Sequence, residues 1–242
     1  NIAIENYQNG SYSLAYNVLN DVLSENQFAS DPRWKEIKVL AKQYMLQSAI
    51  ALERPDAELA VITYIKEISP DVSAQALIVN LAEYFYNKKE FEKALTYYAK
   101  VSPNRLNNSN AEYLNFQIGY SYFALEKWKE SITAFKKVVA NKESKYFGPG
   151  NYYLGMGYFK EKNYKDALSS FKAIEKVKNY QYLIPYQIAQ IYFIQKNYDE
   201  VIRFGMQYFV VQSYSGCNQF GNTAFYDRFG HFRIFQLIAN GY

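Results

Sequence analysis

Residues 152–171 of this 242-residue chain read YYLGMGYFKEKNYKDALSSF. In this stretch the small residue Gly155 is followed twelve positions later by another, Ala167, and the polar residues 161–163 lie between them. Aromatic residues stand at helical spacing from these two, namely Tyr158, Tyr164 and Phe171. Spacings of three and four put side chains on one face of a helix, so the stretch predicts two helices joined by a short turn. Helices so close in sequence pack antiparallel, with the small residues at their crossing.

The same pair of small residues occurs five times, and successive pairs are 34 to 37 residues apart. The pairs are Ser48/Ala60, Ala82/Ala94, Gly119/Ser131, Gly155/Ala167 and Ala189/Val201. Three residues after the first member of each pair stand Ala51, Phe85, Tyr122, Tyr158 and Tyr192. A unit of this size cannot bury its apolar face alone, so neighbouring units stack. The stack presents an extended surface whose usual role is binding.

The repeated pattern resembles the tetratricopeptide repeat (TPR), whose signature runs leucine-glycine, tyrosine, alanine, phenylalanine and a late proline. Two units match it closely, through Leu154-Gly155, Tyr158, Ala167 and Phe171 and through Ile118-Gly119, Tyr122, Ser131 and Phe135. The resemblance implies an all-α fold, a right-handed TPR superhelix (α-α solenoid) of about five to six helix-turn-helix repeats. The outer units are more degenerate, as repeats near the ends of an array often are.

The register divides the chain into an array over residues 1–209 and a non-repeat segment over residues 210–242. The expected units are about 1–31, 33–71, 72–104, 110–143, 147–178 and 182–209. We expect helices at about 11–24, 33–53, 56–69, 72–87, 90–101, 110–125, 128–141, 148–161, 164–176, 182–195 and 198–211, and a partial first helix that begins at Asn1. Because an apolar helix is cut there, we interpret the chain as a fragment or a processed form. We also predict self-association through the ends of the array.

The segment 210–242 differs in composition from the array. It contains no lysine and no glutamate, and it contains five phenylalanines and four glycines. Three interpretations stay open: a loop with a capping helix at about 223–238, an extension lying in a groove of this or a neighbouring molecule, or sequence not native to the array. We favour the capping helix.

Within the TPR family the first helix of each unit lines the concave side of the superhelix. Carried over position by position, the resemblance implies a partner-binding groove formed by Asn80, Glu83, Tyr113, Phe116, Gln117, Tyr120, Tyr152, Tyr153, Met156, Tyr186, Gln187 and Gln190. Some relatives grip a C-terminal carboxylate with lysine, asparagine and arginine, and this chain lacks that set. Aromatic rings offer apolar area with little entropy to lose, and amides bond a peptide backbone. The implied ligand is an extended or helical polypeptide with apolar side chains.

No motif for catalysis, a cofactor or a metal is evident. Zinc sites need clustered cysteines and histidines, and the chain has one of each. By residue type, Cys217, Asp227 and His231 could supply a nucleophile, an orienting acid and a base. They lie in a segment without a recognisable scaffold, so we interpret them as a free thiol and a surface histidine. We expect no enzyme activity, no cofactor and no metal.

Charge and hydropathy argue against nucleic-acid binding and against a membrane span. The net charge is +4, and lysines alternate with glutamates rather than forming the dense basic stripe of a nucleic-acid-binding protein. We therefore expect no nucleic acid partner. No apolar run reaches 18 residues, so we expect no membrane span in this chain.

The repeat opening at residues 144–155 resembles units of bacterial cell-envelope proteins, such as Tol-Pal-associated periplasmic proteins and outer-membrane assembly lipoproteins. The resemblance implies a scaffold for protein–protein interaction in a cell-envelope assembly, located in the bacterial periplasm or cell envelope. Two alternatives stay open. One is a glycan-binding helical-repeat protein, and the other is a non-catalytic portion of a larger enzyme or regulator.

Overall fold

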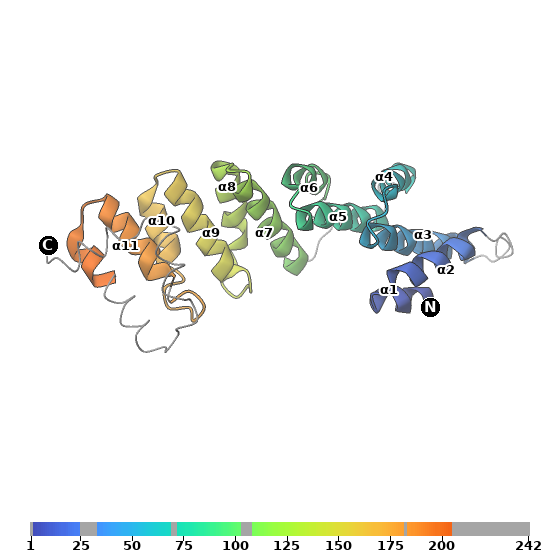
Figure 1. Ribbon diagram of the computed structural model, residues 1–242, viewed down its shortest axis with the longest axis horizontal. Coiled ribbons are helices and arrows are strands. Elements are labelled where there is room, and N and C mark those ends of the chain that lie inside the picture. The colour runs from blue at the N-terminus through green and yellow to red at the C-terminus, as the bar shows by residue number, and fades with distance from the viewer. Residues whose placement is uncertain (1, 25–32, 69–71, 103–107, 182, 205–242) are drawn as a thin grey trace. The chain divides into compact units, whose positions relative to one another are not determined.

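The structure, a computed structural model, describes residues 2–24, 33–68, 72–102, 108–181 and 183–204. All regular secondary structure in these ranges is helical (Figure 1). The helices are α1 (Ile2–Gln8), α2 (Tyr12–Ser24), α3 (Trp34–Ala51), α4 (Ala57–Ile68), α5 (Val72–Asn87), α6 (Phe91–Tyr98), α7 (Asn108–Ala124), α8 (Trp128–Val138), α9 (Phe147–Lys160), α10 (Tyr164–Lys172) and α11 (Ile184–Ile194). Residues 198–204 are helical as well. The predicted all-α helical-repeat solenoid is confirmed. The segment 210–242, with its candidate capping helix, lies outside the described residues.

The chain folds as two compact units, residues 1–125 (unit 1) and 126–242 (unit 2). In unit 1, α1 packs on α2, α3 on α4 and α5 on α6, while α3 and α5 also pack on each other (Figure 1). In unit 2, α9 packs on both α8 and α10, and α10 packs on α11. We call α1, α3, α5, α7, α9 and α11 the first helices. We call α2, α4, α6, α8 and α10 the second helices.

A recurring turn connects each first helix to the second helix of its unit. Lys89, Lys162 and Lys196 each lie seven residues after the first small residue, and their φ angles of 62°, 59° and 58° are left-handed. The next residue donates its N–H to a carbonyl five residues back, as Glu90 does to Phe85 at 2.9 Å. This Schellman arrangement satisfies carbonyl groups at the helix end. It gives successive turns the same geometry.

One turn departs from the predicted register. Arg54 donates its N–H to the carbonyl of Ala49. In the next unit Glu90 makes the equivalent bond to Phe85, so Ala49 occupies the position of Phe85. Ala49 is buried in this position, whereas Ala51, which the sequence pattern assigned to it, is exposed. The assignment of Ala51 is wrong because the turn containing Pro55-Asp56 has five residues between helices, where the next turn has three.

The second helices end earlier than their apolar pattern predicts. Helices α6 and α10 end at Tyr98 and Lys172, three and four residues short of the expected ends. Beyond the helix, Val101 donates its N–H to Tyr98, and Ile174 donates to Phe171, each three residues back. The chain therefore tightens into 3₁₀-type turns. Val101 and Ile174 stay buried in these turns, so the apolar period continues past the helix.

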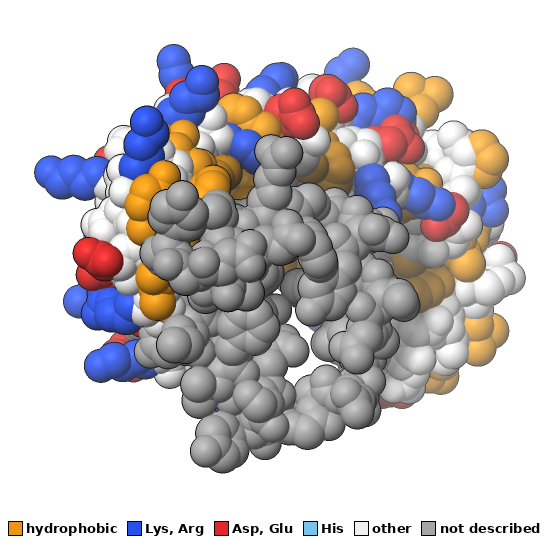
Figure 2. Space-filling model, turned by 60° about the vertical axis from the view of Figure 1, so that its left-hand side comes forward, with side chains coloured by type: hydrophobic (Ala, Val, Ile, Leu, Met, Phe, Trp, Pro, Cys, Tyr) orange, Lys and Arg blue, Asp and Glu red, His pale blue; other side chains and the backbone are white. Residues whose placement is uncertain are grey.

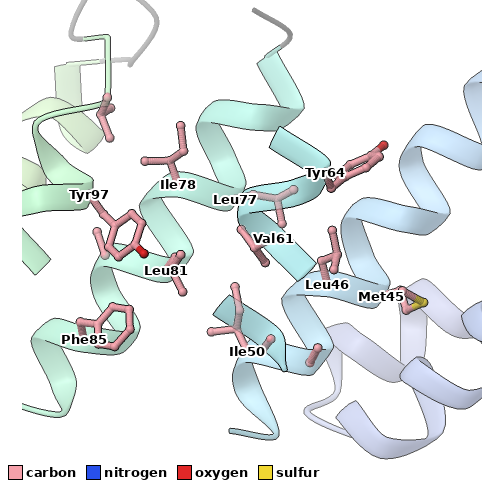
Figure 3. Close-up of a cluster of buried hydrophobic side chains, with 14 of the residues drawn as sticks. Met45, Leu46, Ile50, Val61, Tyr64, Leu77, Ile78, Leu81, Phe85 and Tyr97 are labelled. Atoms are coloured by element: carbon pink, nitrogen blue, oxygen red, sulfur yellow. The ribbon is translucent and has the colours of Figure 1, made fainter. Parts of the chain in front are cut away.

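The core of unit 1 lies between its first and second helices. Figure 3 shows Leu46, Val61, Leu77 and Leu81 pointing toward one another from α3, α4 and α5. All four side chains are almost fully buried. Burying an aliphatic side chain of this size contributes about 1.5 to 3 kcal/mol. Unit 2 has an equivalent core, formed by Ala167, Phe171, Ile174, Ile184, Ile188, Ala189, Ile191 and Phe204.

The crossing of α9 and α10 depends on the absence of a side chain at Gly155. A Cβ atom at this position would lie 2.5 Å from Cε1 of Phe171 and 2.9 Å from its Cζ. The ring of Phe171 is fully buried, so it cannot move aside into solvent. Glycine therefore allows α9 to approach the Phe171 ring directly.

Lysines on the outside of α8 and α10 contact tyrosines of the next first helix. The Lys136 Nζ lies 5.7 Å from the ring centroid of Tyr158, and the Lys172 Nζ lies 5.8 Å from that of Tyr192. Lys172 also donates a hydrogen bond to the Tyr192 hydroxyl at 3.1 Å. Each lysine directly follows the phenylalanine of its repeat in sequence. These cation–π contacts join successive repeats on the outer surface.

The Lys172→Ala variant is expected to lose about 0.5 to 1 kcal/mol of unfolding free energy, because it removes an exposed cation–π contact and a hydrogen bond. Chemical denaturation measures the loss. Lys165→Ala on the same helix is the control, since Lys165 is exposed and lies over no aromatic ring among the described residues. Equal stability of the two variants would show that the contact with Tyr192 contributes nothing.

Candidate functional site: the first-helix face

Side chains of neighbouring first helices meet on one face of unit 1. The rings of Tyr7 in α1 and Tyr44 in α3 are 5.2 Å apart in an edge-on arrangement. Three residues after Tyr44, the Gln47 amide donates to the Asn80 side-chain oxygen at 2.8 Å and links α3 to α5. These contacts place polar and aromatic groups of three first helices on the same face.

The face continues along α5 toward α7. Asn80, Glu83 and Tyr86 follow one another at spacings of three and therefore share one side of α5. The Tyr86 ring lies 5.9 Å from that of Tyr120 in α7. We call Tyr7, Tyr44, Gln47, Asn80, Glu83, Tyr86 and Tyr120 the first-helix stripe.

Glu83 is the one charged residue of the stripe. Burial raises the pKa of its carboxyl group. Burial, followed by the charge of Glu83, also raises the pKa of Tyr98. The Tyr7 pKa is raised by burial, with smaller contributions from Tyr12, Tyr44 and Glu83. The carboxylate therefore lies in a partly desolvated setting with tyrosine hydroxyls nearby.

Gln117, which the resemblance implied as a groove residue, is buried within unit 1. It is 1% exposed, accepts a hydrogen bond from the Tyr98 hydroxyl at 2.9 Å, and donates one to the Tyr113 hydroxyl at 2.9 Å. The amide thus connects Tyr98 of α6 to Tyr113, one turn earlier in α7. In this arrangement it holds Tyr113 in place and presents no surface of its own.

The other implied residues of α7 are more accessible. Tyr113 is 39% exposed, while Phe116 and Tyr120 are half-buried. All three lie within eight residues and on one side of the helix. Together they form a patch of three aromatic rings at the end of the first-helix stripe.

In unit 2 the implied residues of α9 are engaged mainly with their own unit. The Tyr153 ring stacks on Phe135 of α8, with centroids 5.6 Å apart and planes at 13°. The Tyr152 ring stacks on Tyr180 at 6.2 Å, and burial raises the Tyr152 pKa. Met156 is half-buried against the core of the unit. The rims of these three side chains remain accessible on the face of α9.

The implied residues of α11 divide between the core and the surface. Gln187 is buried, with 9% of its surface exposed. Gln190 donates a hydrogen bond to the Tyr186 hydroxyl one turn away, and both residues are half-buried. Tyr186 and Gln190 therefore form an aromatic and amide pair on the surface of α11.

Residues two positions before the first small residue share a role that sequence reasoning missed. Asn80 binds Gln47, Gln117 binds Tyr98, and Tyr153 stacks on Phe135, each on the preceding repeat. This position therefore joins repeats to one another.

Sequence reasoning also did not predict Tyr7, Tyr44 and Gln47 as site residues, because their units are too degenerate for the repeat register to place them. The spacing of three between Tyr44 and Gln47 was the available signal.

The part of the chain that the structure describes contains no group of three histidine, cysteine, aspartate or glutamate side chains able to hold a metal ion. Cys217, Asp227 and His231 lie outside that part. No helix among the described residues is both long and apolar enough to span a membrane.

The Glu83→Gln variant is expected to melt at a higher temperature than the parent at pH 7. A raised pKa means that the folded state disfavours the charged carboxylate, so ionisation costs stability above the folded pKa. This cost vanishes as the pH falls below the unfolded value of about 4.3, where both states are protonated. The gain in melting temperature should therefore disappear near pH 4.

Glu143→Gln is the matched control, because it removes the same charge from an exposed loop. Melting curves recorded from pH 4 to pH 8 separate the two variants. A Glu83→Gln protein that is less stable than the parent at pH 7 would show that the carboxylate is favourably solvated or paired.

Comparison with known proteins agrees with this fold. Residues 113–141 match the family model described as a tetratricopeptide repeat. The curated proteins contain no sequence that matches the chain.

Solved structures of MamA resemble the chain. MamA AMB-1 aligns with 73% of this chain and 88% of its own, at 17% identity and a TM-score of 0.56. A MamA mutant aligns with 73% of this chain and 93% of its own, at 18% identity and a TM-score of 0.53. MamA MSR-1 aligns with 74% and 94%, at 17% identity and a TM-score of 0.52. At these identities the likeness shows a shared helical-repeat fold.

Proposed function

We propose that the chain is a non-enzymatic scaffold that holds a polypeptide on its first-helix face. The observation that carries the proposal is the accessible aromatic surface of α7, where Tyr113 is 39% exposed and held by a hydrogen bond from Gln117. A ring already fixed in place loses little conformational entropy on binding. Such rings are common anchors of protein interfaces.

The chemistry around these rings suits a peptide backbone. In unit 1, the amide side chains of Gln47 and Asn80 belong to the same stripe as the tyrosines of the first-helix face and are half-buried. An amide can both donate to and accept from peptide groups. Because charges on this face are few, we expect binding at roughly micromolar Kd with weak dependence on salt.

The distribution of charge supports a polypeptide partner over nucleic acid. Figure 2 shows basic and acidic side chains interspersed in the described part of the face that it presents. Nucleic-acid binding favours a continuous basic surface, because affinity comes from contacts with many phosphates. Mixed charges provide no such surface.

We further propose that the scaffold acts in a bacterial cell-envelope assembly, in the periplasm or at the envelope. The support is the resemblance of residues 144–155 to repeats of envelope proteins. Fractionation of source cells, followed by immunoblotting of the periplasmic, membrane and cytoplasmic fractions, tests this placement. Recovery in the cytoplasmic fraction alone would contradict it.

Replacing Tyr113 and Tyr120 together by alanine is expected to weaken partner capture about tenfold or more, since hot-spot aromatics contribute over 1 kcal/mol each. Capture on the immobilised chain followed by titration with the recovered partner measures the change. Circular dichroism checks that helicity is preserved.

The control for this experiment is charge reversal on the outer surface of α8, at Lys129 and Lys137. Both lysines are exposed, and neither lies over an aromatic ring among the described residues. Lys136 and Lys172 are unsuitable controls because they contact Tyr158 and Tyr192. If the α8 variants abolish capture and the α7 variants do not, the binding surface lies on the second helices.

A further inference from the structure

Glu83 occupies an unusual setting in the first-helix stripe. On α5 it lies between Asn80, which is bound to Gln47 of α3, and Tyr86, whose ring meets that of Tyr120 of α7 in an edge-on arrangement. Every other member of the stripe is a tyrosine or an amide. A single negative charge is thus placed among uncharged groups on the face proposed to bind a partner.

The carboxylate is not compensated within the described parts of the chain. No hydrogen bond or ion pair to Glu83 occurs among those residues, although its side chain is half-buried. By contrast, the exposed Glu53 is paired with Lys88. A carboxylate taken partly out of water without a partner costs free energy, and a cation brought beside it recovers that cost.

We propose that Glu83 receives a lysine or arginine side chain of the polypeptide held on the first-helix face. The proposal rests on the proposed function and specifies the chemistry of its partner. The carboxylate supplies the ionic contact, and Asn80 beside it supplies an acceptor oxygen. The rings of Tyr7, Tyr44 and Tyr86 supply faces over which the cation or its aliphatic stem packs.

The charge of the whole chain makes this recognition local. The net charge is +4 and the calculated isoelectric point is about 8.8. A cationic peptide is therefore repelled by the molecule as a whole at neutral pH. Preferential binding of a basic side chain must come from a particular site, which makes the effect of a single carboxylate measurable.

Four pools of capped nonapeptides test the proposal. Each pool fixes the central residue as lysine, arginine, glutamate or norleucine, an uncharged residue similar in size to lysine, and the other positions vary among uncharged residues. Biolayer interferometry measures their retention on the full chain. We expect the lysine and arginine pools to be retained about three- to tenfold more strongly than the norleucine pool, and the glutamate pool least.

The Glu83→Gln variant is expected to lose this preference while still retaining the norleucine pool. Glu143→Gln, with the same change of net charge on an exposed loop, should keep the preference. Equal retention of the lysine and norleucine pools by the parent, or a preference that survives Glu83→Gln, would overturn the proposal.

The uncharged pool separates this inference from the proposed function. If Tyr113→Ala with Tyr120→Ala reduces retention of the norleucine pool but lysine confers no advantage, the scaffold function stands and the role of Glu83 fails. If no pool is retained, both fail. As a second readout, a lysine peptide should lower the pKa of the Glu83 carboxyl in a carbon-13 titration, and a norleucine peptide should not.

Discussion

The Gly155→Leu variant is expected to unfold with a free energy about 3 kcal/mol lower than that of the parent. Even the first added atom, Cβ, would lie 2.5 Å from a ring carbon of Phe171. Because Phe171 is fully buried, the ring has no free volume to enter. Helices α9 and α10 must therefore separate, which removes packing along the whole contact. Urea denaturation followed by circular dichroism measures the loss.

Alanine variants separate this steric effect from helix propensity. Alanine stabilises a helix interior by about 1 kcal/mol relative to glycine. At Gly148 the added Cβ would lie 2.8 Å from one atom of the Tyr180 ring, Cε2, and this half-exposed ring can give way more easily than the fully buried Phe171. Gly148→Ala should be near neutral, whereas Gly155→Ala should destabilise. Equal behaviour of the two alanine variants would show that the α9–α10 contact is not tight.

Damage at Gly155 should also spread to the neighbouring repeats. In stacked repeats stability depends on nearest-neighbour interfaces. Hydrogen exchange is therefore expected to accelerate in α8 and α11 as well as in α9 and α10, since these helices pack in sequence through unit 2. Exchange that changes in α9 alone would contradict the stacked arrangement.

Replacing Gln117 by leucine is expected to cost about 2 kcal/mol, the second largest effect. The leucine side chain fills similar space, but it leaves the Tyr98 hydroxyl without its acceptor. That hydroxyl belongs to a side chain only 3% exposed, so water cannot readily replace the amide. The same change also frees Tyr113 from the amide that orients it.

A double-mutant cycle isolates the hydrogen bond between Tyr98 and Gln117. Adding Tyr98→Phe to Gln117→Leu removes the orphaned hydroxyl, so the double variant should be more stable than Gln117→Leu alone by about 1 kcal/mol. Losses that simply add would mean that the two side chains are not coupled. Peptide binding by Gln117→Leu should weaken, because Tyr113 loses the hydrogen bond from the Gln117 amide.

Sequence reasoning placed the helix pairs because their apolar and aromatic periods reflect burial. Its error at Ala51 has a clear cause: Ser48 is small and fully buried, so it resembled the small residue of the pair. The turn at Pro55-Asp56 is two residues longer than the next one, and the spacing of apolar and aromatic residues does not reveal this extension. Helix ends were also overestimated, because residues such as Ile174 remain buried after the helix has ended.

The candidate site was less predictable than the fold. The repeat register identifies which side of a first helix a residue occupies, and it groups Asn80 with Glu83 on α5. The register does not tell whether the side chain of such a residue contacts the preceding repeat or solvent. Tyr153 and Gln117 show the difference, since contacts with Phe135 and Tyr98 depend on distances between helices. The partial burial of Glu83 likewise arises only when several helices meet.

Site-specific photo-crosslinking tests most directly whether a polypeptide binds on the first-helix face. Benzoylphenylalanine replaces Tyr113 on the first-helix face in one protein and Lys137 on the outer surface of α8 in another, and both proteins are irradiated in source cells. We expect a polypeptide crosslinked at position 113, with weak or no product at position 137. Crosslinking of a polypeptide at position 137 without any at position 113 would contradict it.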